Sequence, residues 1–186
     1  MAKIDWNKMK TKHGYAADEV ISALQKSIRR SEEDDAVFFA YEMLVTSDDL
    51  ADKFWQRVLT ISVEDIGLAN PQLVATIYAL HQNYILLKGQ SDAFLQALFA
   101  VVLLARSRKS RLIDELFNNL RAKVEVENYR REIPDYALDK HTEKGEAMGR
   151  GDLHFWETAS QLKDDASTHE KQHLQEILQR LKQKQP

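Results

Sequence analysis

Hydrophobic residues between positions 50 and 61 recur at steps of three and four, which is the spacing of one face of a helix. The stripe consists of Leu50, Phe54, Val58 and Ile61. Ser47 stands where a helix cap is expected, and Gly67 supplies a stop. The pattern therefore predicts a helix over about 48–65, around which the rest of the chain is organised.

The same spacing recurs along most of the chain and predicts further helices. Together the predicted helices cover about 16–30, 34–45, 48–65, 71–88, 91–104, 110–122 and 168–184. Ser31 and Ser91 precede acidic residues and are expected to cap the helices that follow them. Pro71 suits the first turn of a helix, and Lys88-Gly89 suits the end of one.

The pattern changes after residue 123. Residues 124–127 alternate between valine and glutamate, which would suit a short strand, but the sequence offers it no partner strand. The loop 141–151 contains three glycines, and the stretch from about 168 to 184 predicts an amphipathic helix. We therefore expect a basic arm over 1–15, a helical domain over 16–123 and an extension over 124–186.

The predicted fold class is all-α. We expect a multi-helix bundle of six or seven helices, with an irregular glycine-containing C-terminal extension and a terminal amphipathic helix. A chain of 186 residues with 44% hydrophobic residues is long enough to bury a substantial core. It offers no stretch of about 18 uncharged apolar residues that would cross a membrane, and its first residues lack an apolar signal core. These features predict a cytoplasmic protein.

Composition and motifs exclude several kinds of chemistry. The sequence has no cysteine, so a disulfide, a thiolate nucleophile and a cysteine-ligated zinc ion are ruled out. It has no phosphate-binding Walker A motif and no His-Glu-x-x-His zinc motif. His169 and His173 are four positions apart, but solvent-exposed histidines are the simpler interpretation. We expect no metal and no cofactor, and we find no catalytic constellation.

Glu64 and Asp65 are unusual because they lie near the carboxyl end of a predicted helix, where the dipole disfavours negative charge. Adjacent side chains on a helix point about 100° apart, so the two acids do not suit a general acid–base pair. We expect them to hold the turn at Gly67 or to pair with Arg29, Arg57 or Arg106.

Two basic segments, 3–12 and 106–111, are candidates for contacts with a nucleic-acid backbone. The second segment carries the positive charges of Arg106, Arg108, Lys109 and Arg111 at the start of a predicted helix. The net charge of −3 supplies no general attraction to nucleic acid, so any contact has to be local. The cluster would equally suit acidic groups of the same chain or of a sister subunit. Gly149-Arg150-Gly151 resembles a phosphate loop only weakly, and a tight turn before a helix is the simpler interpretation.

Three stretches together resemble one family. They are residues 22–29 (Ser-Ala-Leu-Gln-Lys-Ser-Ile-Arg), residues 61–71 (Ile-Ser-Val-Glu-Asp-Ile-Gly-Leu-Ala-Asn-Pro), and Lys109-Ser110. In this order they look like the C-terminal half of the replication-associated recombination protein A (RarA/MgsA) family of AAA+ ATPases. The resemblance spans about residues 18–156 and includes weaker matches over 133–142 and 149–151.

The resemblance implies an α-helical domain that follows an ATPase core and drives homotetramer formation. It also implies work at stalled replication forks, with an AAA+ ATPase, single-strand-binding protein or DNA as partners. The positions that match the family's motifs are Ser22, Lys26, Arg29, Glu64, Asp65, Gly67, Pro71, Lys109 and Ser110. Arg106, Arg108, Lys109, Arg111 and Arg150 are the candidates for contact with a nucleic acid or a partner.

The chain departs from the family at several points. It has no ATPase core, and its initial methionine and uninterrupted tail favour a stand-alone relative of the oligomerisation domain. The family's Arg-Gly-Ser-Asp-Pro-Asp becomes residues 29–34 here and loses its glycine and its proline, and the family's Pro-Lys-Ser becomes Arg108-Lys109-Ser110. The leading hypothesis is a non-enzymatic domain that forms homo-oligomers and is linked to DNA replication or repair. The alternative is a DNA-binding module that uses segments 3–12 and 106–111, and an enzyme is the third and weakest hypothesis.

Overall fold

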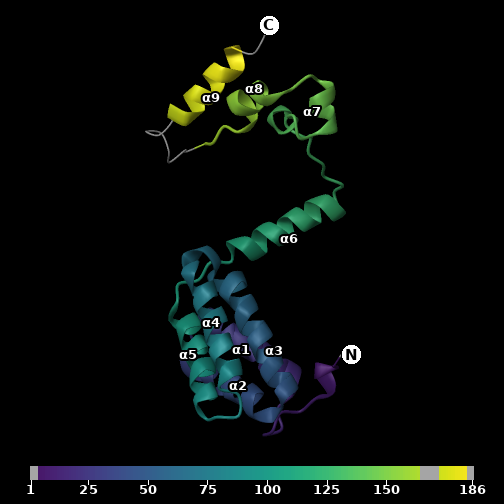
Figure 1. Ribbon diagram of the computed structural model, residues 1–186. Helices are drawn as coiled ribbons and strands as arrows, with labels where there is room; N and C mark the ends of the chain where they lie inside the picture. The colour runs from purple at the N-terminus through teal and green to yellow at the C-terminus, as the bar shows by residue number, and fades with distance from the viewer. Residues whose placement is uncertain (1–3, 164–171, 184–186) are drawn as a thin grey trace. The chain divides into compact units, whose positions relative to one another are not determined.

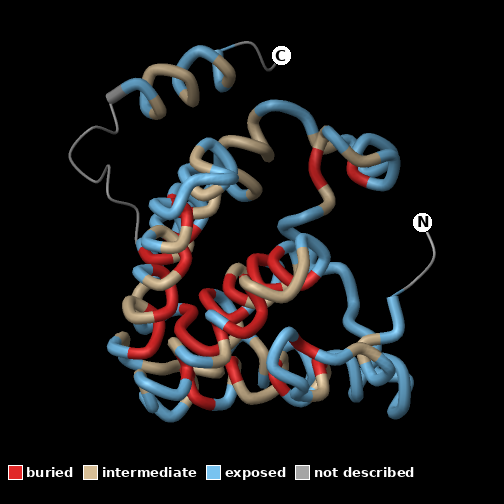
Figure 2. Tube along the Cα trace, turned by 90° about the horizontal axis from the view of Figure 1, so that it is seen from below, coloured by how far each residue is buried: buried red, intermediate tan, exposed pale blue. Residues whose placement is uncertain are grey.

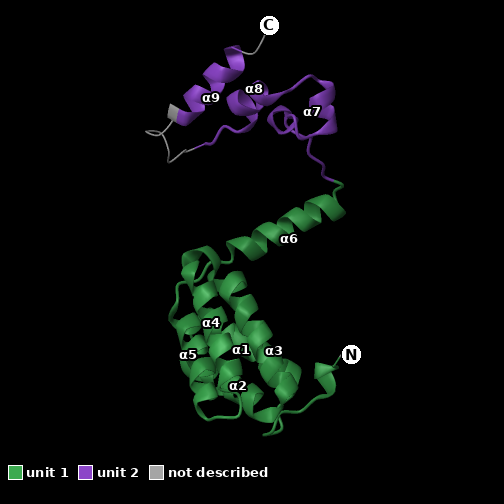
Figure 3. Cartoon of the chain, in the orientation of Figure 1, with its two compact units in different colours: residues 1–128 green, residues 129–186 purple. Residues whose placement is uncertain are grey.

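The computed structural model describes residues 4–163 and 172–183, and the regular elements in these ranges are helices, which confirms the all-α prediction. The chain divides into two compact units, residues 1–128 and residues 129–186 (Figure 3). We call them unit 1 and unit 2 and describe each by itself. The division that we predicted from composition, at residue 123, stays a prediction.

Unit 1 is a helical bundle built from a nearly continuous series of helices (Figure 1). Its α-helices are α1 (Ala17–Arg30), α2 (Glu33–Thr46), α3 (Asp48–Ile61), α4 (Gln72–Leu86), α5 (Asp92–Arg106) and α6 (Leu112–Glu125). Shorter elements are the 3-10 helix η1 (Trp6–Lys8), the π-helical turn η2 (Ser62–Ile66) and the 3-10 turn η3 (Gly67–Ala69). The predicted helices of residues 16–122 are thus present, with ends shifted by a few residues.

The core of unit 1 lies between α1, α2, α3, α4 and α5, whose inner faces carry the buried residues (Figure 2). Helix α1 packs on α2, α2 packs on α3 and α5, and α4 packs on α5. The predicted stripe of the third helix is fully buried, and Trp55 beside it contacts Phe54 at 5.2 Å between ring centroids. This burial explains why the three- and four-residue spacing predicted the bundle correctly.

The N-terminal arm lies against the bundle. Trp6 packs on the core, the backbone N–H of Lys12 donates to Thr46 Oγ1 at 3.0 Å, and His13 contacts the buried carboxylate of Glu42. Tyr15 meets Phe38 edge to face at 5.9 Å. Trp6 and Tyr15 therefore hold this segment against the bundle.

Two local predictions, the caps at Ser31 and Ser91, need correction. Ser31 has a left-handed backbone with φ of 62° and ends α1, so it does not cap α2, whose first flanking residue is Glu32. Ser91 has helical backbone angles, and no cap hydrogen bond from its side chain is formed within the described structure. Residues 124–127 are not a strand, because α6 continues to Glu125. The cap predicted at Ser47 is confirmed, since its Oγ accepts from the Leu50 N–H at 3.2 Å.

Unit 2 consists of short helical turns and one longer helix. Its elements are η4 (Asp135–Ala137), α7 (Glu143–Ala147), α8 (Asp152–His154), η5 (Phe155–Ala159) and α9 (Gln172–Gln183). Helix α9 contacts α8 and η5, and Lys182 Nζ lies 2.7 Å from Glu157 Oε1. The terminal helix predicted over 168–184 is present as α9, whereas His169 lies outside the described residues.

Across residues 4–163 and 172–183, no helix combines the length and the apolar character that crossing a membrane requires.

Candidate functional site

The two acids of the family motif, Glu64 and Asp65, lie just after the end of α3 and share hydrogen-bond donors that come from α1. Gln25 Nε2 donates to Glu64 Oε1 and to Asp65 Oδ2, at 2.9 Å in each case. Arg29 Nε donates to Asp65 Oδ1 at 2.6 Å, and Arg29 Nη2 lies 3.3 Å from Glu64 Oε1. Although we expected the two acids to point about 100° apart, the same two donors of α1 reach both of them.

The acids lie in the π-helical turn η2, a wider turn that often marks a functional or strained position. Asp65 is fully buried, so its negative charge depends on the arginine beside it. The prediction that an arginine compensates Glu64 and Asp65 is confirmed for Arg29, and Arg57 Nη2 lies 3.8 Å from Glu64 Oε2. Arg106 does not join this group and pairs with Glu33 instead.

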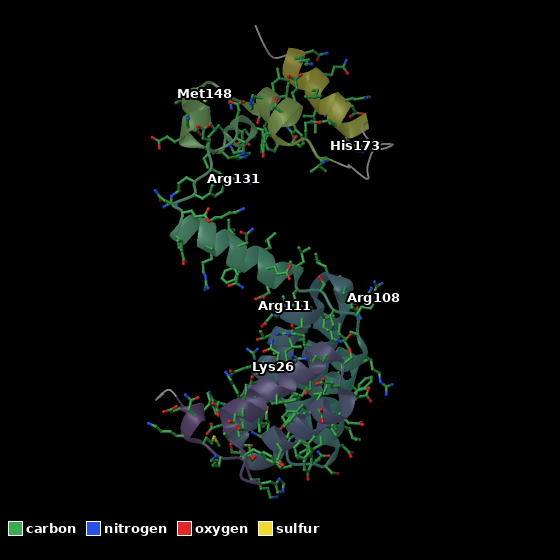
Figure 4. All side chains as sticks on the ribbon, turned by 180° about the vertical axis from the view of Figure 1, so that it is seen from behind. Lys26, Arg108, Arg111, Arg131, Met148 and His173 are labelled. Atoms are coloured by element: carbon green, nitrogen blue, oxygen red, sulfur yellow. The ribbon has the colours of Figure 1, made fainter. Side chains whose placement is uncertain are left out.

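Arg111 extends the network to the start of α6. Figure 4 labels Arg111, which lies where α6 begins. Its Nη2 lies 3.8 Å from Glu64 Oε1 and also contacts Asp114. The hydrogen bond to Asp114 raises the pKa of Arg111 above its usual value. Three arginines thus face three carboxylates. We call these residues, together with Gln25, the charged junction, and its members are Gln25, Arg29, Arg57, Glu64, Asp65, Arg111 and Asp114. Its charges balance, which suits a structural joint more than a site that attracts an ion.

Main-chain contacts fix α6 to the same place. The backbone N–H of Ser110 donates to the Asp65 carbonyl at 2.9 Å. Gly67 has φ of 46°, a backbone conformation that residues with a side chain rarely adopt. A Cβ at Gly67 would also lie 3.4 Å from the Ser110 carbonyl oxygen. Glycine therefore allows the turn after η2 to approach the segment before α6.

Lys109 is a helix cap in this structure. Its Nζ donates to the carbonyls of Leu104, Ala105 and Ser107 at 3.0, 2.8 and 2.6 Å, where α5 ends with unpaired acceptors. Ser31 Oγ lies 3.2 Å from the same nitrogen. Burial lowers the pKa of Lys109, and the negative charge of Asp65 opposes that shift.

Most of the positive side chains in segment 106–111 are therefore bound by groups of the same chain. Arg106 binds Glu33 through two nitrogens, and this hydrogen bonding lowers the pKa of Glu33 and raises that of Arg106. Lys109 and Arg111 are engaged as described above. Arg108 is exposed at the outside of the bundle and, within the described residues, has no hydrogen bond or ion pair (Figure 4). In segment 3–12, Lys8 pairs with Asp5 at 3.2 Å, Lys10 and Lys12 are exposed, and Lys3 lies outside the described residues.

Arg150 is also held internally. Its Nη1 donates to the carbonyls of Asp135 and Leu138 at 2.8 and 2.7 Å, and its Nη2 donates to Asp135 Oδ1 at 2.6 Å. These bonds join η4 to the glycine turn of unit 2, where Gly149 has φ of 71°. The predicted tight turn before a helix is thus present, and α8 follows it.

The remaining motif residues are not brought to the charged junction. Ser22 is half-buried on α1, Lys26 is exposed on the same helix (Figure 4), and Pro71 precedes α4. Sequence analysis did not single out Gln25, which contacts both acids and Arg57. Its position four residues before Arg29, on the same helix face, was the available signal.

A second candidate site is the apolar face of α6. Every residue of this helix is at least partly exposed, and its large hydrophobic side chains lie on one face. They are Leu112, Ile113, Leu116, Phe117, Leu120 and Val124. Two shallow hollows adjoin the face, one lined by Val63, Ile113 and Phe117 and the other by Phe117, Leu120 and Val124. We call these six residues the α6 face.

The charged junction and the α6 face differ in chemistry, since the first is a set of paired charges and the second is apolar. Within the part of the chain that the structure describes, no group of three histidine, cysteine, aspartate or glutamate residues is placed to hold a metal ion. The carboxylates of the charged junction are bound by arginines, so they are poor candidates for proton transfer. The geometry suits a joint that positions the α6 face.

Comparison with known proteins supports the family suggested by the motifs. The family model described as the MgsA AAA+ ATPase C terminal matches residues 30–184. The chain is 32% identical over 145 residues to replication-associated recombination protein A of Bacillus subtilis, covering 75% of this chain and 32% of that protein. It is 33% identical over 96 residues to an uncharacterized AAA domain-containing protein of Mycobacterium tuberculosis, covering 51% of this chain and 21% of that protein.

The chain thus spans about a third of the length of the Bacillus relative, and the match covers the C-terminal region of the family. Because the family model matches residues 30–184, the chain belongs to the family of MgsA AAA+ ATPase C-terminal domains.

Proposed function

We propose that this chain is a non-enzymatic assembly domain that forms homo-oligomers and serves DNA replication, recombination or repair in the cytoplasm. The observation that carries the proposal is the α6 face, whose six side chains are between 38% and 58% exposed. Monomeric proteins rarely expose a contiguous apolar surface of this kind, and such surfaces commonly bind another protein. The similarity to replication-associated recombination protein A of Bacillus subtilis supports the link to replication.

A homotetramer is the assembly that the family resemblance favours. A tetramer with dihedral symmetry needs two different faces, each of which meets the same face of another copy. Unit 1 offers apolar residues for a second contact on α5, where Leu95 and Phe99 are 63% and 54% exposed. The chain therefore has enough apolar surface for more than one interface between copies.

An AAA+ ATPase and single-strand-binding protein are the further partners that we propose. The family model that matches this chain describes the C terminal of an AAA+ ATPase, so an ATPase core is a natural companion. A pull-down from native cell extract tests this part of the proposal. Recovery of either protein supports it, and recovery of neither at near-physiological salt contradicts it.

Size-exclusion chromatography with light scattering tests assembly directly. We expect, at tens of micromolar, a molar mass that is a multiple of the 21.5 kDa chain mass, with a tetramer as the end point. Dilution should shift the mass towards smaller species, because association depends on concentration. A strict monomer at tens of micromolar would contradict the proposal.

Direct DNA binding by segments 3–12 and 106–111 stays a prediction, and the structure gives it less support. Arg106, Lys109 and Arg111 are engaged within the chain, so Arg108 is the cation of that segment that is best placed for a phosphate. Forked or single-stranded DNA should then bind weakly, with a strong dependence on salt.

A further inference from the structure

The α6 face has the spacing of a two-helix seam. Ile113, Phe117, Leu120 and Val124 follow steps of four, three and four, which is the a/d pattern of a heptad repeat, and Leu116 widens the seam on one side. Such a seam is normally covered by a second helix, whose side chains fill the gaps between the side chains of the first helix. The hollow lined by Phe117, Leu120 and Val124 is a gap of this kind. The second hollow lies beside Ile113 and Phe117 and is bounded on its other side by Thr60, Val63 and Glu64 of the bundle.

The charges on α6 indicate the direction of the second helix. Its start carries Arg111, Asp114 and Glu115, and its last turns carry Arg121, Lys123 and Glu125, so the first end has one excess negative charge and the second end one excess positive charge. A parallel copy would place like charges side by side, whereas an antiparallel copy places the acidic end of one helix beside the basic end of the other. The helix dipoles also favour the antiparallel arrangement.

The seam is self-complementary in that arrangement. When Phe117 lies opposite Leu120 of the other copy, Ile113 lies opposite Val124 of the other copy, so all four seam positions are matched at once. Arg121 already covers the Phe117 ring at 5.6 Å and can extend the contact at the rim. Two-fold contacts between identical surfaces are also the commonest kind in homo-oligomers.

We propose that the α6 face binds the α6 face of a second copy of this chain, antiparallel and around a two-fold axis between Phe117 and Leu120. This inference rests on the proposed function, because it names the surface through which the assembly domain associates. The charged junction then has a defined task, since it fixes the base of the helix that carries the contact.

Replacing a central seam residue tests the surface. Phe117→Asp removes a large apolar side chain and adds a carboxylate in both copies, so the dissociation constant of the contact should rise by at least about a hundredfold. The mass measured by light scattering should fall at least by half. Asn119→Asp adds the same charge at an exposed position of α6 outside the seam and should leave the mass unchanged.

Paired cysteines test the direction, and the absence of natural cysteine makes each introduced thiol unique. An equal mixture of Ile113→Cys and Val124→Cys chains should form disulfide-linked dimers on mild oxidation. Each variant alone should not, because in the antiparallel pair its two thiols lie about 16 Å apart along the helices, beyond disulfide reach. Circular dichroism should show native helix content in every variant.

The outcomes separate this inference from the proposed function. A monomeric unsubstituted chain would overturn both. An oligomer whose mass is unchanged by Phe117→Asp would leave assembly intact and overturn the α6 contact, because another surface would then join the copies. Efficient cross-linking of Ile113→Cys with itself would overturn the antiparallel direction.

Discussion

At the scale of single residues, Asp65 is the centre of the charged junction. It is fully buried, its side chain binds Gln25 and Arg29, and its carbonyl accepts from the N–H of Ser110. A buried ion pair is costly to break, because the remaining charge loses its partner without regaining water. The stability of unit 1 should therefore be sensitive to this one carboxylate.

We predict that Asp65→Asn lowers the free energy of unfolding by about 2–4 kcal/mol, because Arg29 is left beside a neutral amide. Glu64→Gln is the matched control, since it removes the same charge from the neighbouring residue, whose side chain is 24% exposed. That change should cost at most about 1 kcal/mol. Urea unfolding followed by circular dichroism measures both, and equal losses would contradict the role assigned to burial.

Sequence analysis predicted part of this site. The position of Glu64 and Asp65 near a helix end indicated that an arginine compensates them, and Arg29 and Arg57 were among the candidates. It did not predict the bond from Ser110 to Asp65, because the two residues are 45 positions apart and the bond uses main-chain atoms. The sequence pattern also could not indicate that Lys109 caps α5, because a lysine within a basic run looks the same whether it caps a helix or lies on a binding surface.

At the scale of elements, helices α1 to α5 were predicted well because their buried faces enforce the three- and four-residue spacing. The errors lie at ends, where local chemistry competes. Ser31 was expected to cap α2, but it takes a left-handed conformation and its Oγ meets Lys109 instead. The alternation over 124–127 was too short to indicate a strand, and the helical residues before it carried α6 to Glu125.

The packing of α7 in unit 2 gives an element-scale prediction. Gly145 is buried in α7, and a Cβ there would lie 1.9 Å from the carbonyl oxygen of Asp139. We expect Gly145→Ala to force α7 away from the Asp139 turn and to destabilise it by about 1–3 kcal/mol. Hydrogen exchange should then become faster over residues 135–155.

Gly151→Ala serves as the control for that change. A Cβ at Gly151 meets open space, and its backbone φ of −99° is compatible with alanine. Exchange in this variant should match that of the unsubstituted chain. Identical protection in the two variants would show that the close approach at Gly145 does not hold α7 in place.

At the scale of the whole molecule, the cluster of buried hydrophobic residues found among the described residues runs from Ala17 to Leu104, within unit 1. The α6 face also belongs to this unit. A fragment of residues 1–128 therefore contains a complete core together with the proposed contact surface.

We predict that residues 1–128 alone fold and assemble to the same number of copies as the full chain. Light scattering measures the number of copies, and thermal unfolding followed by circular dichroism measures folding. A folded but monomeric fragment, beside an assembled full chain, would assign the contact to unit 2.

The bond between the Ser110 N–H and the Asp65 carbonyl attaches α6 through atoms that every residue except proline possesses. Its attachment at this point is therefore insensitive to most substitutions farther along the helix. Changes at outward positions can then alter what α6 recognises without detaching it from the bundle. The atoms that attach α6 and the side chains that recognise a partner are therefore different, so one scaffold can acquire new partners through substitutions in a single helix.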